Sequence, residues 1–248
     1  MNATSPRVLV VVPTYNERDN IATLVEQLLA CGPSYGVLVV DDQSPDGTGE
    51  VVDALAARYP GRVEAMHRTG KRGLGRSYVD ALSVAITRDV DVICQMDADF
   101  SHDPAYLPRL VSALGTGGFD LVIGSRYLHG VSVVNWPLRR LILSAFANRY
   151  VRAVTGLPAS DCTSGYRCWR KEALARLPLQ RFVSDGYAFL VEMLYEAMGA
   201  GCRIGEEPII YVERREGQSK MSRGVIFESV LMPWQVVLRN PGARRRRG

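Results

Sequence analysis

Asp97 and Asp99 stand one residue apart, directly after an apolar run over residues 90–96. Two carboxylates this close repel each other unless a cation or hydrogen bonds offset their charge. Carboxylate oxygens suit a hard divalent ion such as Mg²⁺ or Mn²⁺, and Mg²⁺ commonly completes its coordination with water and substrate phosphates. The pair therefore predicts a divalent-metal site. Helix capping is the alternative, and it explains Asp103 before Pro104 better than it explains Asp97.

Polar residues also follow two earlier apolar runs. Tyr15 and Glu17 come after the first run, and an aromatic ring and an acid could stack on a nucleobase and hydrogen-bond to it. The alternative, which the local sequence favours, is a turn with Asn16 as a helix N-cap and Glu17 in the first helical turn. Asp41 and Asp42 follow the second run. One of them could accept a hydrogen bond from a nucleobase while the other holds the turn.

Apolar runs alternate with segments of helical periodicity through about residue 124. Strands are expected at residues 8–12, 37–40, 63–66, 90–96 and 121–123, and helices at residues 17–29, 48–58, 77–87 and 106–114. This order predicts an α/β fold with a largely parallel sheet, and uninterrupted apolar strands indicate that both faces are covered. Ligands of such sheets bind beyond the carboxyl ends of the strands, so the polar strand ends should converge on one site.

The second half of the chain has a different pattern and no internal repeat. Helices are expected at residues 136–154, 186–198 and 225–238, with a short strand at residues 209–212. The helix at residues 225–238 is apolar and carries one charge, Glu228. A run of arginines, Arg244 to Arg247, is the only biased segment.

Composition limits the classes of function. The 248 residues carry a net charge of +4, which the arginine tail alone supplies, so the body is nearly neutral. This balance argues against a nucleic-acid partner. The five cysteines show no C-x-x-C spacing, which suggests neither a zinc site nor a disulfide framework and favours a reducing cytosol. No uncharged apolar stretch approaches the roughly 20 residues that a membrane-spanning helix needs.

Seven segments occur in an order and at distances that resemble one known family. They read VVPTYNERDNI, VVDDQSPDGTGEV, GLGRSYVDAL, MDADFSHDP, GSRY, DCTSGYRCWRKEAL and EEPIIYVERREGQSKMS. Together they are similar to the dolichol-phosphate mannose synthases, or polyprenyl-phosphate mannosyltransferases, which are inverting family-2 glycosyltransferases of the GT-A fold. The resemblance covers roughly residues 7–223. It implies a Rossmann-like GT-A catalytic domain over residues 1–223, followed by a C-terminal amphipathic helix and basic tail over residues 224–248.

The resemblance also implies GDP-mannose as donor, a divalent metal (Mg or Mn) as cofactor and a polyprenyl phosphate as acceptor. The residues carried over to the guanosine end of the donor are Pro13, Tyr15, Glu17, Val40 and Asp42. Those carried over to the metal and the diphosphate-sugar are Asp97, Ala98 and Asp99, with the two aspartates as metal ligands. Phosphate contacts are carried over to Arg126, Arg214 and Lys220, and the expected catalytic residues are Asp97, Asp99 and Arg126. Some relatives have glutamine where this chain has Ser101, whose hydroxyl is a weaker metal ligand.

The acceptor decides whether the reaction needs a general base. A phosphate monoester is mostly a dianion at pH 7, since its second pKa is about 6, and it can attack the sugar without losing a proton. Arg140 and Ser144 lie four residues apart in an expected helix and therefore on one face. With Arg126 they are expected to bind this phosphate, for in-line attack with inversion at the anomeric carbon. Asp185 is the best candidate for a conventional base, although an N-cap before Gly186 is the favoured reading.

A lipid acceptor requires contact with a membrane. One segment has apolar residues among arginines and is typical either of an interfacial helix or of a core helix, and its apolar residues are Trp136, Leu138, Leu141, Ile142, Leu143 and Phe146. The expectation is a peripheral protein on the cytoplasmic face of a membrane. A separate membrane-anchoring subunit is a candidate partner.

Two other functions remain open on the sequence. A polyprenyl-phosphate glucosyltransferase that uses UDP-glucose would share most of the motifs. A nucleotide-binding module without turnover is disfavoured by the intact acidic pair and by the cationic segment near Lys220. No P-loop and no G-x-S-x-G motif is present. His102, close to Asp99, is the only histidine whose position suggests a role.

Overall fold

A seven-stranded sheet forms the centre of the computed structural model, which describes residues 5–70, 73–212 and 223–239. The strand order is β3-β2-β1-β4-β7-β5-β8, and β7 runs antiparallel to both of its neighbours. The strands are β1 (Val8–Thr14), β2 (Tyr35–Asp41), β3 (Val63–His67), β4 (Val92–Gln95), β5 (Leu121–Ser125), β7 (Arg167–Arg170) and β8 (Ile204–Pro208). A separate parallel pair consists of β6 (Val133–Val134) and β9 (Tyr211–Val212).

The strands are apolar throughout because both faces of the sheet are buried. In β1, Leu9 and Val11 belong to one hydrophobic core, whereas Val8, Val10 and Val12 belong to the other. Successive side chains of a strand point to opposite faces, so a strand with two buried faces needs apolar residues at every position. The uninterrupted apolar runs of the sequence have this cause.

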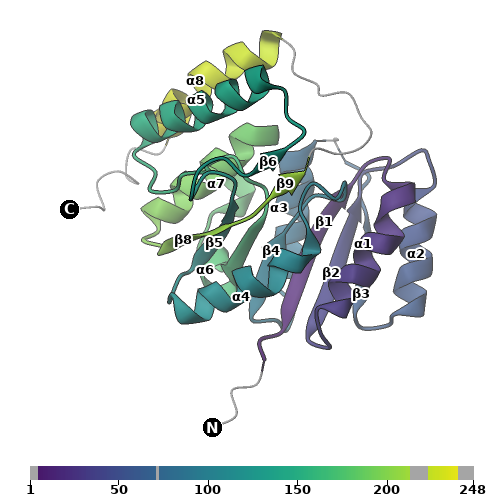
Figure 1. Ribbon diagram of the computed structural model, residues 1–248. Coiled ribbons are helices and arrows are strands. Elements are labelled where there is room, and N and C mark those ends of the chain that lie inside the picture. The colour runs from purple at the N-terminus through teal and green to yellow at the C-terminus, as the bar shows by residue number, and fades with distance from the viewer. Residues whose placement is uncertain (1–4, 71–72, 213–222, 240–248) are drawn as a thin grey trace.

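Helices cover the two faces of the sheet, as Figure 1 shows. The face with Val8 packs against α1 (Arg18–Ala30), α2 (Thr48–Arg58) and α4 (Leu107–Thr116). The opposite face packs against α3 (Leu74–Ala85), α6 (Lys171–Ala175) and α7 (Gly186–Gly199). The buried side chains of α1 recur with helical spacing, at Ile21, Leu24, Val25, Leu28 and Leu29.

Two long helices, α5 (Leu138–Thr155) and α8 (Arg223–Arg239), lie side by side at one end of the molecule (Figure 1). The indole nitrogen of Trp234 on α8 donates to the hydroxyl of Tyr150 on α5 at 2.9 Å. Short 3-10 helices form at η1 (Pro104–Tyr106) and η2 (Leu179–Arg181). Among the residues described, no helix is both long and apolar enough to cross a bilayer.

The elements expected through residue 124 are confirmed, and so is a largely parallel sheet. The expected helices of the second half are also present, as α5, α7 and α8. The sequence did not predict β6, β7, β8 or the short α6. The expected domain boundary at residues 223/224 falls at the first residues of α8, while residues 213–222 before it and the basic tail lie outside the described residues.

Candidate active site

The carboxyl ends of β1, β2 and β4 meet at one edge of the sheet, as the sequence predicted. Thr14, the last residue of β1, is paired with Asp41, the last residue of β2, and β4 lies on the other side of β1. The backbone N–H of Asp42 donates to the carbonyl of Thr14 at 3.0 Å, which joins the first two strand ends. Tyr15, Asp42 and Asp97 therefore emerge from neighbouring strands on the same edge.

The backbone turns sharply just after each of these three strands. Asn16, Gln43 and Phe100 have positive φ angles of 61°, 57° and 58°. Asparagine tolerates this left-handed conformation, but for phenylalanine it is costly, and such strain concentrates at functional sites. The strain at Phe100 lies directly after Asp99, so the loop that carries the acidic pair is held in its shape by the surrounding structure.

The acidic pair is positioned by a histidine and a serine. The backbone N–H of Asp97 donates to Nδ1 of the buried His102 at 3.2 Å. Burial lowers the pKa of His102, although the charge of Asp97 opposes this shift, so the ring stays neutral and can accept that bond. Oδ1 of Asp99 accepts the backbone N–H of Ser101 at 3.1 Å and its hydroxyl at 2.5 Å. Ser101 thus serves as a support for Asp99.

The residues at this edge fit a divalent cation. The side chain of Asp97 is 35% exposed. A Cβ at Gly165 would lie 3.6 Å from Oδ1 of Asp97, so the glycine leaves space beside this carboxylate. Within the described part of the chain, no group of three or more His, Cys, Asp and Glu could hold a metal. Two carboxylates alone suit an ion of the Mg²⁺ type, which takes its other ligands from water and phosphates.

At the predicted guanosine end, Tyr15 is exposed and Glu17 is half-buried. The expectation that Asn16 caps α1 was wrong, because Glu17 occupies the N-cap position and makes no capping bond with its side chain. The carboxylate of Glu17 instead accepts the side-chain amide of Asn20 at 2.8 Å. The left-handed turn at Asn16 carries the chain past the position from which it could cap the helix.

One of Asp41 and Asp42 was expected to hold the turn and the other to accept a hydrogen bond from a nucleobase, and the structure accounts for the first role only. Asp41 holds the turn, since its Oδ2 accepts the backbone N–H of Ser44 at 3.1 Å. Asp42 is buried and accepts from the guanidinium of Arg68 at 2.6 Å and from the backbone N–H of Gly73 at 3.1 Å. A nucleobase contact by Asp42 stays a prediction. Of the other residues predicted there, the side chain of Val40 is fully buried and Pro13 is half-buried.

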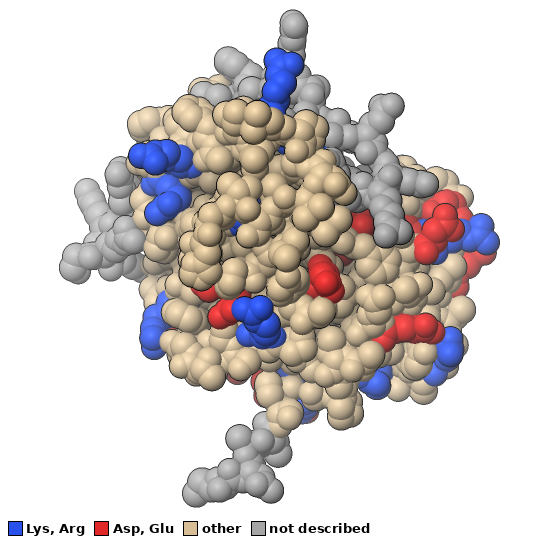
Figure 2. Space-filling view, in the orientation of Figure 1, with Lys and Arg blue, Asp and Glu red and all other residues tan. Residues whose placement is uncertain are grey.

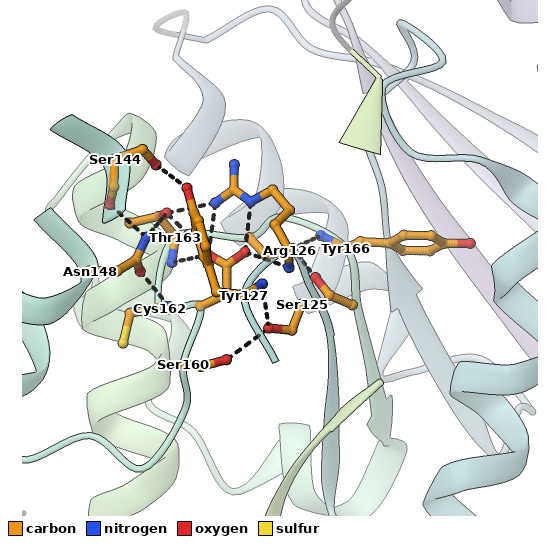
Figure 3. Close-up of polar contacts among 12 residues, drawn as sticks. Ser125, Arg126, Tyr127, Ser144, Asn148, Ser160, Cys162, Thr163 and Tyr166 are labelled. Atoms are coloured by element: carbon orange, nitrogen blue, oxygen red, sulfur yellow. Dashed lines mark hydrogen bonds and ion pairs between the residues drawn. The ribbon is translucent and has the colours of Figure 1, made fainter. Parts of the chain in front are cut away.

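Arg126, the residue that follows β5, is buried in an ion pair with Asp161 (Figure 3). Its Nε and Nη2 donate to the two carboxylate oxygens at 2.6 and 2.7 Å, and Nη2 also donates to the hydroxyl of Thr163 at 2.8 Å. Burial is the largest single influence on the pKa of Asp161 and would raise it, but the charge of Arg126 together with the hydrogen bonds from Arg126 and Thr163 lowers the pKa overall. Both groups are therefore charged, and the pair has the two-pronged geometry of a strong ionic contact.

Aromatic rings enclose the guanidinium of Arg126. Its Cζ lies 5.6 Å from the ring centroids of Tyr127 and Trp136 and 5.4 Å from that of Tyr211. The Cζ of Arg140 lies 4.3 Å from the same Trp136 ring. One indole thus contacts both arginines that the sequence assigned to the acceptor phosphate, and these distances are within the range of cation–π attraction.

The third predicted phosphate residue joins this group through a tyrosine. The hydroxyl of Tyr127 donates to Ser144 Oγ at 2.8 Å (Figure 3). Tyr211 connects the group with the acidic edge, because its ring centroid lies 5.7 Å from that of His102, which contacts Asp97. Burial raises the pKa of Tyr211 to about 12, so its hydroxyl keeps its proton. The residues predicted to bind the metal and those predicted to bind the phosphate therefore lie on either side of Tyr211.

The loop of residues 160–164, which carries Asp161, is held from three sides. Glu206 on β8 accepts two backbone N–H groups of the loop at 2.7 and 3.1 Å. Asn148 on α5 accepts a third at 2.8 Å. Arg167 on β7 donates to two loop carbonyls at 3.0 and 2.9 Å. Asp161 and Glu206 belong to segments that resemble the family, but the sequence predicted no role for either residue. A single acidic residue in a polar segment gives no local indication of its partner.

Two predicted caps are confirmed, and two predicted phosphate contacts cannot be placed. Asp103 accepts the backbone N–H of Ala105 at 2.8 Å at the start of η1. Asp185 caps α7 through the N–H of Gly186 at 2.8 Å and also accepts that of Gly75 at 2.5 Å. Helix capping therefore explains the position of Asp185, the best candidate for a general base in the sequence. Arg214 and Lys220 lie outside the described residues.

Comparison with known proteins agrees with this geometry. The chain is 45% identical over 224 residues to the polyprenol monophosphomannose synthase of Mycolicibacterium smegmatis, covering 90% of this chain and 84% of that protein. It is 43% identical over 244 residues to the undecaprenyl-phosphate mannosyltransferase of Micrococcus luteus, covering 98% and 99% of the two chains. These relatives bear out the resemblance that the ordered motifs indicated.

A solved structure supports the fold. Glucosyl-3-phosphoglycerate synthase from Mycobacterium tuberculosis, crystallised with Mn²⁺, UDP and glucosyl-3-phosphoglycerate, superimposes with a TM-score of 0.66 at 18% identity, covering 96% of this chain and 80% of that one. The expected GT-A fold is confirmed. The family model for glycosyl transferase family 2 matches residues 9–177. With its helix-flanked sheet, its acidic edge and these relatives, the chain belongs to glycosyl transferase family 2 and is a glycosyltransferase.

Proposed function

We propose that this protein transfers mannose from GDP-mannose to a polyprenyl phosphate with inversion, which yields polyprenyl-phosphate mannose. The observation that supports it most is the pair of ring contacts of Tyr211, which lies 5.7 Å from His102 at the acidic edge and 5.4 Å from Arg126. A site that binds a sugar diphosphate and a second phosphate needs cation-binding carboxylates and an anion-binding group side by side. The names of the two relatives supply the substrate class: a polyprenol or undecaprenyl phosphate and a mannosyl group.

On the donor side, Asp97 and Asp99 would hold the divalent metal. Such an ion, when bound, offsets the negative charge that the diphosphate gains as it leaves the sugar. The chain's own part is to keep the two carboxylates in place: Ser101 donates two hydrogen bonds to Asp99, and His102 accepts the N–H of Asp97. Tyr15, Glu17 and Asp42 would meet the guanosine, because they emerge from the adjacent strand ends.

On the acceptor side, the site suits a nucleophile that needs no base. A phosphate monoester is already a dianion at neutral pH. Asp185, the best candidate base in the sequence, caps α7 and binds the N–H of Gly75, which explains it without a proton transfer. Arg126, Arg140 and Ser144 would bind the phosphate and direct one of its oxygens at the anomeric carbon opposite the leaving diphosphate. A sugar hydroxyl, which must lose a proton, suits this arrangement less well.

The test is a substrate matrix. Purified protein is incubated with GDP-mannose or UDP-glucose and a short polyprenyl phosphate, with and without a chelator, and the lipid product is identified by mass spectrometry. We expect mannosyl lipid from GDP-mannose alone and its loss with the chelator. Product from UDP-glucose would favour the glucosyltransferase, and metal-dependent GDP binding without any lipid product would favour a binding module.

We further propose that α5 and α8 hold the protein against the cytoplasmic face of a membrane. The side chains of Leu138, Ile142 and Phe146, spaced four residues apart on one face of α5, are 68%, 60% and 67% exposed. On α8, Trp234 and Leu238 are also exposed. The surface over α5 in Figure 2 is largely uncharged, with basic side chains and no acidic ones on α5 itself. Exposed apolar residues beside basic ones are typical of a helix that lies in a membrane interface.

Flotation with liposomes tests the membrane proposal. The protein should float with vesicles that contain anionic phospholipid, and more weakly with vesicles of neutral lipid, because the arginines of α5 add electrostatic attraction. Absence of flotation with both would contradict direct attachment. In that case a separate membrane-anchoring subunit, sought by co-purification, becomes the remaining route to a lipid acceptor.

A further inference from the structure

The amino terminus of α5 is built to receive an anion. Pro137 is its N-cap, and no side chain caps the amide groups of the first turn. That turn contains no acidic residue and instead carries Arg139 and Arg140. Unsatisfied amide groups and the helix dipole make such an end favourable for phosphate. A helix end alone does not make a site, but a second feature lies directly beside this one.

That second feature is the indole of Trp136, two residues before α5. Its Nε1–H is shielded from solvent and has no hydrogen-bond partner among the described residues. Buried donors are rarely left unpaired, because the donor then loses its water without replacement. The centroid of the same ring lies 4.3 Å from Cζ of Arg140 and 5.6 Å from Cζ of Arg126, so the indole that carries this donor contacts two residues of the group assigned to the acceptor phosphate.

The charge of the group also requires more donors than the arginines alone. A phosphate dianion carries two negative charges. Asp161 already accepts two hydrogen bonds from Arg126 and balances its charge. Arg140 is the other positive charge of the predicted trio. Uncharged N–H groups can donate further hydrogen bonds to the phosphate. They add no positive charge that would need a counter-charge when the phosphate is absent.

We propose that the indole N–H of Trp136 and the amino terminus of α5 bind the phosphate of the acceptor lipid. This inference rests on the proposed function for the identity of the phosphate. It adds two uncharged groups, the indole N–H of Trp136 and the amino terminus of α5, to the predicted phosphate site of Arg126, Arg140 and Ser144. Ser144 fits the arrangement, because its oxygen accepts from Tyr127 and its own hydroxyl hydrogen can still be donated to the phosphate.

The variant Trp136→Phe tests this directly, since phenylalanine keeps an aromatic face for both arginines but has no N–H. Rates are measured with a short, water-soluble polyprenyl phosphate, so that membrane contact plays no part. We expect the acceptor KM to rise about tenfold, the effect of one lost hydrogen bond to a charged group, while the KM for GDP-mannose stays unchanged. Trp234→Phe is the matched control on α8, and both of its KM values should equal those of the wild type.

An unchanged acceptor KM in Trp136→Phe would overturn the inference, and so would an equal rise in both KM values. Should the variant fail to fold, the wild-type protein offers a second measurement. Its three tryptophans give three indole ¹H–¹⁵N signals. Trp234→Phe identifies one of them, and slow hydrogen exchange identifies Trp169, because its buried indole N–H donates to Gln95 at 2.8 Å, whereas that of Trp136 has no hydrogen-bond partner among the described residues. The remaining signal should shift with short polyprenyl phosphate and stay in place with the unphosphorylated alcohol; a shift with neither overturns the inference.

The two proposals can fail separately. A wild-type protein that makes no mannosyl lipid would contradict the proposed function, yet the indole signal would still report whether the phosphate binds beside Trp136. A protein that makes mannosyl lipid with the same acceptor KM in wild type and Trp136→Phe would keep the function and remove the inference.

Discussion

The acidic edge, Asp97 and Asp99, and the buried pair of Arg126 and Asp161 are constructed differently. The side chain of Asp97 is 35% exposed, whereas that of Asp161 is fully buried. Asp161 has its counter-charge built into the protein, in Arg126 at 2.6 Å. Asp97 donates its backbone N–H to His102, Asp99 accepts from Ser101, and the two carboxylates suit a cation that arrives with the substrate. The acidic pair thus depends on a ligand for its counter-charge, whereas the Arg126–Asp161 pair is balanced within the protein. Substitution of the acidic pair should therefore affect mainly turnover, and substitution of Asp161 mainly stability.

The largest effect is expected at the open edge. Asp97→Ala should lower turnover by about 10²- to 10³-fold, the usual loss when one group that stabilises transition-state charge is removed. Its melting temperature should change little, because the side chain is partly exposed. Asp103→Ala is the matched control: it removes a cap, should cost about 1 kcal/mol of stability, and should leave turnover unchanged. If Asp97→Ala kept most of its activity, the edge would not be catalytic.

The next largest effect is expected on stability, from a substitution in the buried ion pair of Arg126 and Asp161. Asp161→Asn leaves the guanidinium of Arg126 without its counter-charge, and breaking a buried ion pair in this way costs about 3–5 kcal/mol. Urea unfolding gives the free energy. Glu64→Gln is the control, since it breaks an exposed pair with Arg88 and should cost less than about 1 kcal/mol. Equal losses in the two variants would mean that burial does not distinguish these pairs.

The same pair predicts how stability depends on pH. The pKa of Asp161 in the folded protein lies below its ordinary value of 3.8. The pair therefore stabilises the fold in full above pH 3.8, and this contribution disappears as the pH falls toward the folded pKa. The difference in unfolding free energy between wild type and Asp161→Asn should be constant from pH 5 to 7 and shrink below pH 4. A difference that grew in acid would contradict the assignment.

The outer face of α5 adds a third kind of surface, apolar and exposed. The double variant Leu138→Glu, Phe146→Glu should weaken liposome binding by at least about tenfold, since each side chain contributes more than 1 kcal/mol of apolar transfer. Its rate with a water-soluble acceptor should stay unchanged. Two glutamates on an exposed face of α2, Ala54→Glu with Ala57→Glu, provide the control. Equal loss of binding in both would indicate general repulsion by added charge.

The smallest expected effect tests whether Ser144 belongs to the group of residues around Arg126. Tyr127→Phe removes the hydrogen bond to Ser144, which is worth about 0.5–1.5 kcal/mol. We expect a two- to tenfold rise in acceptor KM, because Ser144 loses the bond that orients its hydroxyl. Tyr59→Phe removes an exposed hydrogen bond to Glu26 at 3.3 Å and should change neither KM. An equal acceptor KM in Tyr127→Phe and the wild type would place Ser144 outside the phosphate site.

How much the sequence could predict also differs between the two regions. The acidic edge follows from apolar runs that end in polar residues, because strand burial and the chemistry of carboxylates are local properties. The first half of the fold was predictable for the same reason. β7 reads RCWR and was not predicted, because its two arginines interrupt the apolar run that indicates a buried strand. In the structure Arg167 is buried and donates to three backbone carbonyls.

The surroundings of Arg126 depend on contacts between distant segments. Asp161 lies 35 residues from Arg126, and Glu206 lies 46 residues from Ser160, which it holds in place. The hydrophobic periodicity of a sequence does not indicate such pairs. Glu206 is also one reason why β8 was not predicted, since a carboxylate inside a strand usually indicates an exposed position. The prediction grouped Arg126 of the family motif with Arg140 and Ser144 on one face of an expected helix, and only the three-dimensional arrangement adds Trp136, Tyr127 and Tyr211.

The reversed direction of β7 has one further effect. In a sheet with every strand parallel, the segment that enters a strand lies on the edge opposite the ligand. Because β7 runs against β4 and β5, its entry segment, residues 160–166, arrives at the same rim as the exits of its neighbours. Chain length before this strand and chain length after it therefore have unequal meaning: an insertion ahead of Arg167 would fall at the rim that holds Arg126 and Asp161, whereas one beyond Arg170 would fall on the far rim, away from both.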